Sequence, residues 1–219
     1  MVRESIARKS AIGQERKERP KLRSFSGGPP SFVSQAPPVD NARLGLLIFL
    51  AAETMFFAGL IGAFLVFRLG SVPWPPPFQP RLPIAVTGVN TIILLLSGVT
   101  VQLALRAIRS GNQPGLTWFL SATALLGLVF LGIQGYEWIR LIRFGLTMSS
   151  GVYGATFYTL IGCHALHVLG AVVWLGVVLA LARGGRFSAE RSTGVQLCAI
   201  YWTFVVALWP VLYGLVYLY

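Results

Sequence analysis

Five long apolar segments occupy most of residues 41–219, and they constrain the fold more than any other feature of the sequence. Each is long enough to cross the bilayer core of about 30 Å as a helix, because a helix rises about 1.5 Å per residue. Only 11% of the residues are charged, against about 25% in an average soluble domain, and the mean hydropathy is +0.69. We therefore predict an all-α integral membrane bundle of five transmembrane helices. The expected spans are about 44–67, 84–105, 116–136, 151–182 and 195–219.

The fourth apolar segment, 151–182, carries no acidic residue, lysine or arginine. As a continuous helix it would be about 48 Å long, which exceeds the thickness of the bilayer core. We expect it to tilt, to protrude from the bilayer, or to begin non-helically around residues 149–151.

The net charge is +11, and basic side chains are densest near the N-terminus. Residues 1–40 hold eight of the 18 Lys and Arg side chains, four acids and many Pro, Ser and Gly, which predicts a disordered or extended basic tail. The transmembrane domain is then 41–219. We predict that the tail lies near anionic lipids and binds no nucleic acid, since no nucleic-acid-binding fold accompanies it. Arginine placement predicts an inside N-terminus and an outside C-terminus, in what we expect to be a bacterial inner membrane.

Glu53 lies near the middle of the first apolar segment, where an ionisable side chain suggests a function. We expect either a lipid- or proton-linked carboxyl or an acid that is hydrogen-bonded to a neighbouring helix. Its neighbours at helical spacing are bulky, whereas a stripe of small residues about 100° away favours close helix packing. The small residues expected to pack are Gly45, Ala52, Gly59 and Ala63.

Four polar side chains in or near the later spans are expected to make structural polar contacts: Gln134, Glu137, His164 and His167. Gln134 and Glu137 lie three residues apart on one helix face, and Arg140 is expected to pair with Glu137 at the helix end. The two histidines are the only ones in the chain and share one helix. They cannot sandwich a haem or complete a four-ligand metal site. We predict no metal, no haem and no catalytic residue in this chain.

Several motifs in consistent order resemble subunit III of the haem-copper terminal oxidases, the cytochrome c oxidase subunit III family, in a short five-helix form. They lie at 49–59, 74–76, 90–98, 134–138, 153–157, 162–170 and 201–209. The sequence departs from the family in two ways. Longer members have seven spans, so we expect no counterpart of their first two spans in this sequence. Thr203 and Val206 also stand where the family usually has His and Asp, so the polar network of those groups is not carried over.

The resemblance implies a non-catalytic subunit of a proton-pumping oxidase that works in aerobic electron transport. It implies direct packing on subunit I, which holds the haem and copper, and association with subunit II and other respiratory-complex subunits. Stability of the active site, bound phospholipid and proton uptake are the functions implied. Glu53 is the residue carried over as lipid- or proton-linked. The electron donor is left open between cytochrome c and quinol.

Three alternatives are considered. A subunit-III-like partner of a nitric oxide reductase shares the five-span form. A small membrane transporter would show internal repeats and broken helices, and no such repeat is detected. A haem-binding bundle would place histidines on different helices, whereas both histidines here lie in one segment.

Overall fold

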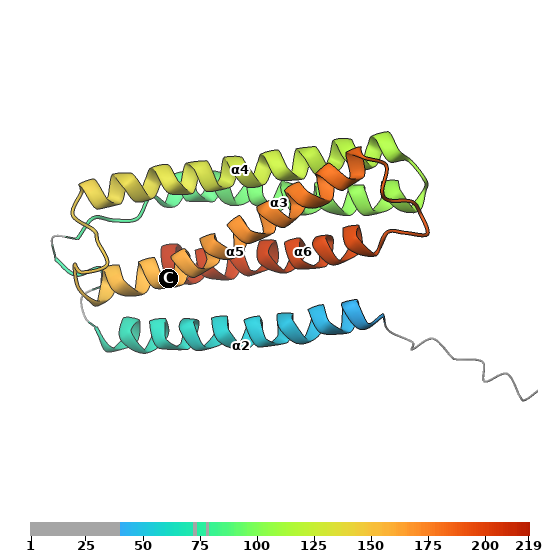
Figure 1. The fold of residues 1–219 in the computed structure, drawn as a ribbon. Helices are drawn as coiled ribbons and strands as arrows, with labels where there is room; N and C mark the ends of the chain where they lie inside the picture. Colours follow the sequence, from blue (N-terminus) through green and yellow to red (C-terminus); the bar gives the residue numbers. More distant parts are fainter. Residues whose placement is uncertain (1–39, 72–73, 78) are drawn as a thin grey trace, which may run out of the picture. The chain divides into compact units, whose positions relative to one another are not determined.

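Five long helices and a short π-helical turn make up most of the computed structural model, which describes residues 40–71, 74–77 and 79–219 (Figure 1). All five are long and apolar enough to cross a membrane, and the described residues contain no strand. The prediction of an all-α bundle with five transmembrane helices is confirmed. The predicted basic tail lies outside the described residues, except for Asp40. The helices are α2 (Asn41–Gly70), α3 (Ile84–Arg109), α4 (Gln113–Arg143), α5 (Val152–Arg183) and α6 (Thr193–Tyr213), followed by the π-helix Gly214–Leu218.

Side-chain caps begin two of the helices at polar residues beside the apolar stretches. The backbone N–H of Ala42 donates to Asp40 Oδ1 over 3.4 Å, and the N–H of Gly115 donates to Asn112 Oδ1 over 2.9 Å. Such caps satisfy N–H groups that have no partner within the helix. Because helical hydrogen bonding continues into polar residues, the helices extend past the expected spans. α4 ends at Arg143 rather than near residue 136.

The long fourth segment begins after a break in helical structure. Residues 149–151 are not helical, and Gly151 has a φ of +111°, a conformation that favours glycine. From Val152 the helix continues without interruption to Arg183. α5 crosses the neighbouring helices obliquely (Figure 1).

The core lies between α3, α4, α5 and α6 and is anchored by two buried tryptophans of α6. Trp202 Nε1 donates to Ser97 Oγ over 3.1 Å, and Trp209 Nε1 donates to Thr91 Oγ1 over 2.8 Å. Both hydrogen bonds join α6 to α3. The ring of Trp202 also approaches Gly127 of α4 so closely that a Cβ there would lie 2.5 Å from Cη2. Glycine at 127 therefore leaves room for the Trp202 ring against α4.

α2 lies at the periphery and packs mainly against α5 and α6. Only Phe57 and Phe64 of this helix are buried, and both belong to its bulky face. All four residues of the small-residue stripe are exposed, although Ala63 also lines a pocket between α2 and α5. No atom lies within 4 Å of a Cβ built on Gly45 or Gly59. The described part of the chain therefore does not provide the packing partner expected for Gly45, Ala52, Gly59 and Ala63.

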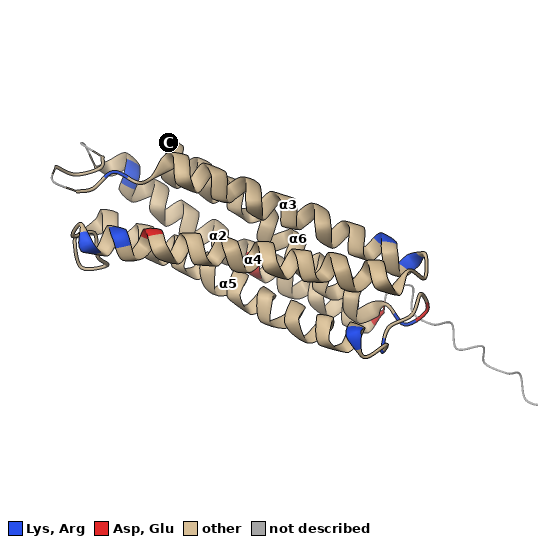
Figure 2. Cartoon of the chain, turned by 90° about the horizontal axis from the view of Figure 1, so that it is seen from above, with Lys and Arg blue, Asp and Glu red and all other residues tan. Residues whose placement is uncertain are grey.

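The charges gather at the two ends of the bundle. Figure 2 shows the blue arginine positions near the helix ends and none midway along the bundle. Such a distribution suits a protein whose middle lies in hydrocarbon, because isolated charges are costly there.

Candidate functional site

The described helices hold one carboxyl–imidazole pair, between α2 and α5. Glu53 Oε2 lies 2.8 Å from His167 Nε2, and His167 Nδ1 lies 2.6 Å from the carbonyl oxygen of Cys163, one turn earlier on α5. The structure thus brings together two residues that the sequence analysis treated separately. Both are more than ten residues from the ends of their helices, near the middle of the bundle.

The geometry restricts where the protons of this pair can be. The Cys163 carbonyl only accepts, so His167 Nδ1 carries a hydrogen and donates it. Nε2 then either donates to a Glu53 carboxylate or accepts from the protonated Glu53 acid. Both arrangements are neutral overall, and both place one proton between Oε2 and Nε2. The site is therefore suited to hold one transferable proton inside the membrane.

Aromatic rings enclose the pair. The Phe57 ring lies edge-on to the His167 ring with centroids 5.1 Å apart, and the Phe56 centroid is 6.4 Å from it. The side chains of His167 and Glu53 remain 20% and 17% exposed, respectively. The pair is thus shielded on the side of the bundle and open on the other side to lipid or to a neighbouring protein.

His164 points in a different direction from His167 and is fully buried. Its ring stacks on Trp209 with centroids 5.0 Å apart, and the rings of Phe57 and Phe130 meet it edge-on at 6.5 Å. Neither ring nitrogen has a hydrogen-bond partner within the described residues. The structure therefore places His164 in aromatic packing, whereas the sequence analysis expected a polar contact.

Gln134 and Glu137, the two polar residues expected on one face of α4, lie in different environments. Gln134 is buried, and its Nε2 donates to the hydroxyl of Tyr217 over 3.2 Å, which joins α4 to the C-terminal π-helix. The Glu137 side chain is only 5% exposed, and its Oε1 lies 3.9 Å from Nη1 of Arg140. That distance is at the limit of an ion pair, so Arg140 satisfies the carboxylate only weakly.

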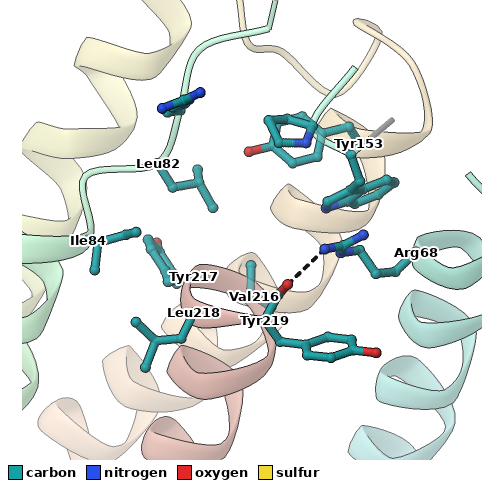
Figure 3. A pocket seen from close by; sticks show the side chains of 11 residues that line it. Arg68, Leu82, Ile84, Tyr153, Val216, Tyr217, Leu218 and Tyr219 are labelled. Atoms are coloured by element: carbon teal, nitrogen blue, oxygen red, sulfur yellow. Dashed lines mark hydrogen bonds between the residues drawn. The ribbon is translucent and has the colours of Figure 1, made fainter. Parts of the chain in front are cut away.

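A pocket of about 170 Å³ lies beside the C-terminal end of the chain, where α2 also ends (Figure 3). Arg68 Nη2 donates to the backbone oxygen of Tyr219 over 2.7 Å. The same guanidinium lies 5.5 Å from the ring centroids of Trp74 and Tyr219. Sequence reasoning missed this contact. The only signal was a basic residue at the end of the first span, near an aromatic C-terminal segment.

Thr203 and Val206, which replace the usual His and Asp of the family motif, have their own contacts. Gln102 Nε2 donates to Thr203 Oγ1 over 2.9 Å, and that hydroxyl donates to the carbonyl oxygen of Ala199 over 2.7 Å. Val206 packs against Gly98, where a Cβ would lie 3.2 Å from Val206 Cγ1. Neither residue contacts the Glu53–His167 pair through a hydrogen bond.

No cluster of three or more metal-ligating side chains occurs in the described ranges. The fold and the site together define a class, an all-α integral membrane protein with a hydrogen-bonded carboxyl–imidazole pair between two of its helices. The family model "Cytochrome c oxidase subunit III" matches residues 34–219. The chain belongs to this family, as the sequence resemblance predicted.

Relatives from distant organisms support the same assignment. The chain is 37% identical to "Cytochrome c oxidase subunit 3" of Synechocystis sp. over 180 residues, which is 82% of this chain and 76% of the relative. It is 34% identical to the Corynebacterium diphtheriae protein of that name over 192 residues, covering 86% of this chain and 93% of the relative. The Cyprinus carpio protein of that name is 36% identical over 188 residues, covering 83% and 71%.

Proposed function

We propose that this chain is the non-catalytic subunit III of a haem-copper terminal oxidase and that the Glu53–His167 pair is its proton-linked site. The 2.8 Å contact between Glu53 and His167 carries the second part of the proposal. The family match across residues 34–219 carries the first part. In this proposal the chain packs directly on subunit I, associates with subunit II and other respiratory-complex subunits, and supports stability, lipid binding and proton uptake.

The haem and copper belong to the partner subunits in this proposal. Both ring nitrogens of His167 are already engaged, and His164 is enclosed by Trp209, Phe57 and Phe130. These engagements favour structural and proton-holding roles for the histidines over metal ligation. Gln134 and Glu137 remain proposed as structural contacts, and the exposed small-residue stripe of α2 as a packing surface for a helix of another chain.

The orientation proposed is N-terminus inside and C-terminus outside, in a bacterial inner membrane. Six arginines lie at the inner end of the described helices in this orientation, and four lie at the outer end. The basic residues of 1–40 add to the inner side. The names of the relatives favour an oxygen reductase supplied by cytochrome c over a quinol oxidase or a nitric oxide reductase.

Purification of the native complex in mild detergent tests the subunit assignment. We expect mass spectrometry to find oxidase subunits I and II with this chain. The haem absorbance should stay with subunit I when this chain is stripped off. Haem that followed this chain instead would contradict the accessory role, and co-purification with a nitric oxide reductase would contradict the oxidase assignment.

The substitution Glu53→Gln tests the proton-linked site. A glutamine at 53 can still donate to His167 Nε2, but it holds no transferable proton. We therefore expect normal assembly and haem content, with slower proton uptake or faster loss of activity during turnover. Unchanged proton uptake and durability would refute the proton role, and loss of assembly would show a structural role instead.

A further inference from the structure

A second charged pocket, of about 310 Å³, lies between the last turns of α4 and the segment that leads into α3. Its charged lining consists of Arg81, Glu137 and Arg140. Leu141, Phe144 and two prolines provide apolar walls. The pocket is at the end of the bundle, near the C-terminus of α4. A helix that spans the bilayer core places such an end at the level of the lipid headgroups.

Glu137 is the unusual member of this lining. Its side chain is 5% exposed, and its only ion pair is the 3.9 Å contact to Arg140. No hydrogen-bond donor reaches its carboxylate from within the described ranges. A nearly buried carboxylate is costly unless donors surround it, so a donor in the pocket would relieve this cost.

The two arginines come from separate elements, and both are exposed. Arg140 is 53% exposed; its guanidinium lies 5.9 Å from the centroid of the Phe144 ring and 3.9 Å from Glu137 Oε1, so most of its N–H groups still face the pocket. Arg81 is exposed and forms no hydrogen bond or ion pair with another described residue. By contrast, Arg68 in the pocket of Figure 3 is already occupied by Tyr219 and Trp74. Paired guanidinium groups recognise phosphate well, because their planar N–H groups match its oxygens.

We propose that this pocket binds the headgroup of a phospholipid with a primary amine, such as phosphatidylethanolamine. The phosphate lies between Arg81 and Arg140, and the ammonium donates to Glu137. Such a headgroup has a negative phosphate, which matches the two arginines, and a positive ammonium, which matches Glu137. A choline headgroup lacks the N–H donors, and a glycerol headgroup lacks the positive charge. The inference does not depend on the oxidase assignment.

Native mass spectrometry of the full chain, with whatever subunits co-purify, provides the test. The probes are phosphatidylethanolamine, phosphatidylcholine and phosphatidylglycerol with identical acyl chains, with inorganic phosphate as competitor. We expect phosphatidylethanolamine to bind roughly fivefold more tightly than phosphatidylcholine. Glu137→Gln should abolish this preference. Arg81→Gln or Arg140→Gln should weaken the binding of both lipids by about fivefold. Arg143→Gln, at an exposed neighbouring position, is the matched control and should change the binding of neither lipid.

Equal binding of the ethanolamine and choline lipids would overturn the proposal. The proposal would also fail if phosphatidylglycerol bound more tightly than phosphatidylethanolamine and if Glu137→Gln strengthened phosphatidylglycerol binding further. That result would indicate a site for anionic lipids. Displacement of the lipid by millimolar inorganic phosphate would show that a free anion is the ligand. If Glu137→Gln fails to fold, two measurements still test the proposal: the preference of the unsubstituted protein for the ethanolamine lipid, and the loss of binding in Arg81→Gln, a residue outside the helices. A loss in Arg143→Gln equal to that in Arg81→Gln would identify non-specific charge attraction.

Discussion

The hydrogen bond between Glu53 and His167 predicts a measurable energetic coupling between α2 and α5. The perturbation is Glu53→Leu and His167→Leu, made singly and together. Hydrogen bonds between membrane helices contribute about 0.6 kcal/mol on average and about 1.7 kcal/mol at most. This bond is short, but about a fifth of each side chain is exposed, at 17% for Glu53 and 20% for His167. We therefore expect a coupling free energy of about 1–1.5 kcal/mol.

The coupling is measured as a double-mutant cycle in the free energy of unfolding, with sodium dodecyl sulfate titrated into mixed micelles. Glu53→Gln is the matched control, since its amide N–H still donates to His167 Nε2, and it should lose less stability than Glu53→Leu. If the two single losses add up to the double loss within about 0.3 kcal/mol, the residues are not coupled and the reasoning fails.

Two further predictions concern the core between α3, α4 and α6. In Gly127→Ala the new Cβ would lie 2.5 Å from Trp202 Cη2, so we expect a loss of about 1–3 kcal/mol and a lower thermal midpoint in detergent. Gly132→Ala, on the same helix with no atom within 4 Å, is the control and should be neutral or stabilising; equal midpoints would contradict the prediction. Trp209→Phe removes the 2.8 Å donation to Thr91 and should cost about 1 kcal/mol in the same unfolding assay, and an unchanged stability would show that this bond does not hold α6 to α3.

The number and class of the helices are predictable from the sequence because hydrocarbon imposes one requirement on every span. Backbone groups must be satisfied within the helix and side chains must be apolar, so composition identifies the spans. The helix ends are less predictable. α4 continues through Glu137 and Arg140 to Arg143, and a search for apolar residues stops before them. Helical hydrogen bonding does not depend on polarity, so a helix extends past its apolar stretch.

The rotation of α2 about its own axis is not predictable in this way. The small-residue stripe suggested one contact face, but the bulky face with Phe57 and Phe64 packs on the bundle. That rotation also brings Glu53 to His167, which lies 114 residues later. Burial of large aromatic rings and one interhelical hydrogen bond outweigh close backbone approach here. No local pattern in the sequence reports such a balance.

The different environments of His164 and His167 were also not predictable, because they depend on how neighbouring helices pack. Their spacing placed both on one helix, and this ruled out a haem held between them. It did not reveal that His167 faces α2 while His164 faces Trp209 in the core. Three residues on a helix turn a side chain by about 300°, so the two rings point about 60° apart, and neighbouring helices then decide their environments.

The placement of the Glu53–His167 bond also determines how strongly an electric field acts on its proton. The bond runs from α2 to α5 and so crosses between neighbouring helices, and its heavy atoms are 2.8 Å apart. A transmembrane voltage of 100 mV does about 2.3 kcal/mol of work on a unit charge that crosses the whole membrane. Over less than a tenth of a core of about 30 Å, the work is at most about 0.2 kcal/mol. Local side chains, and not the voltage across the membrane, therefore decide which partner holds the proton.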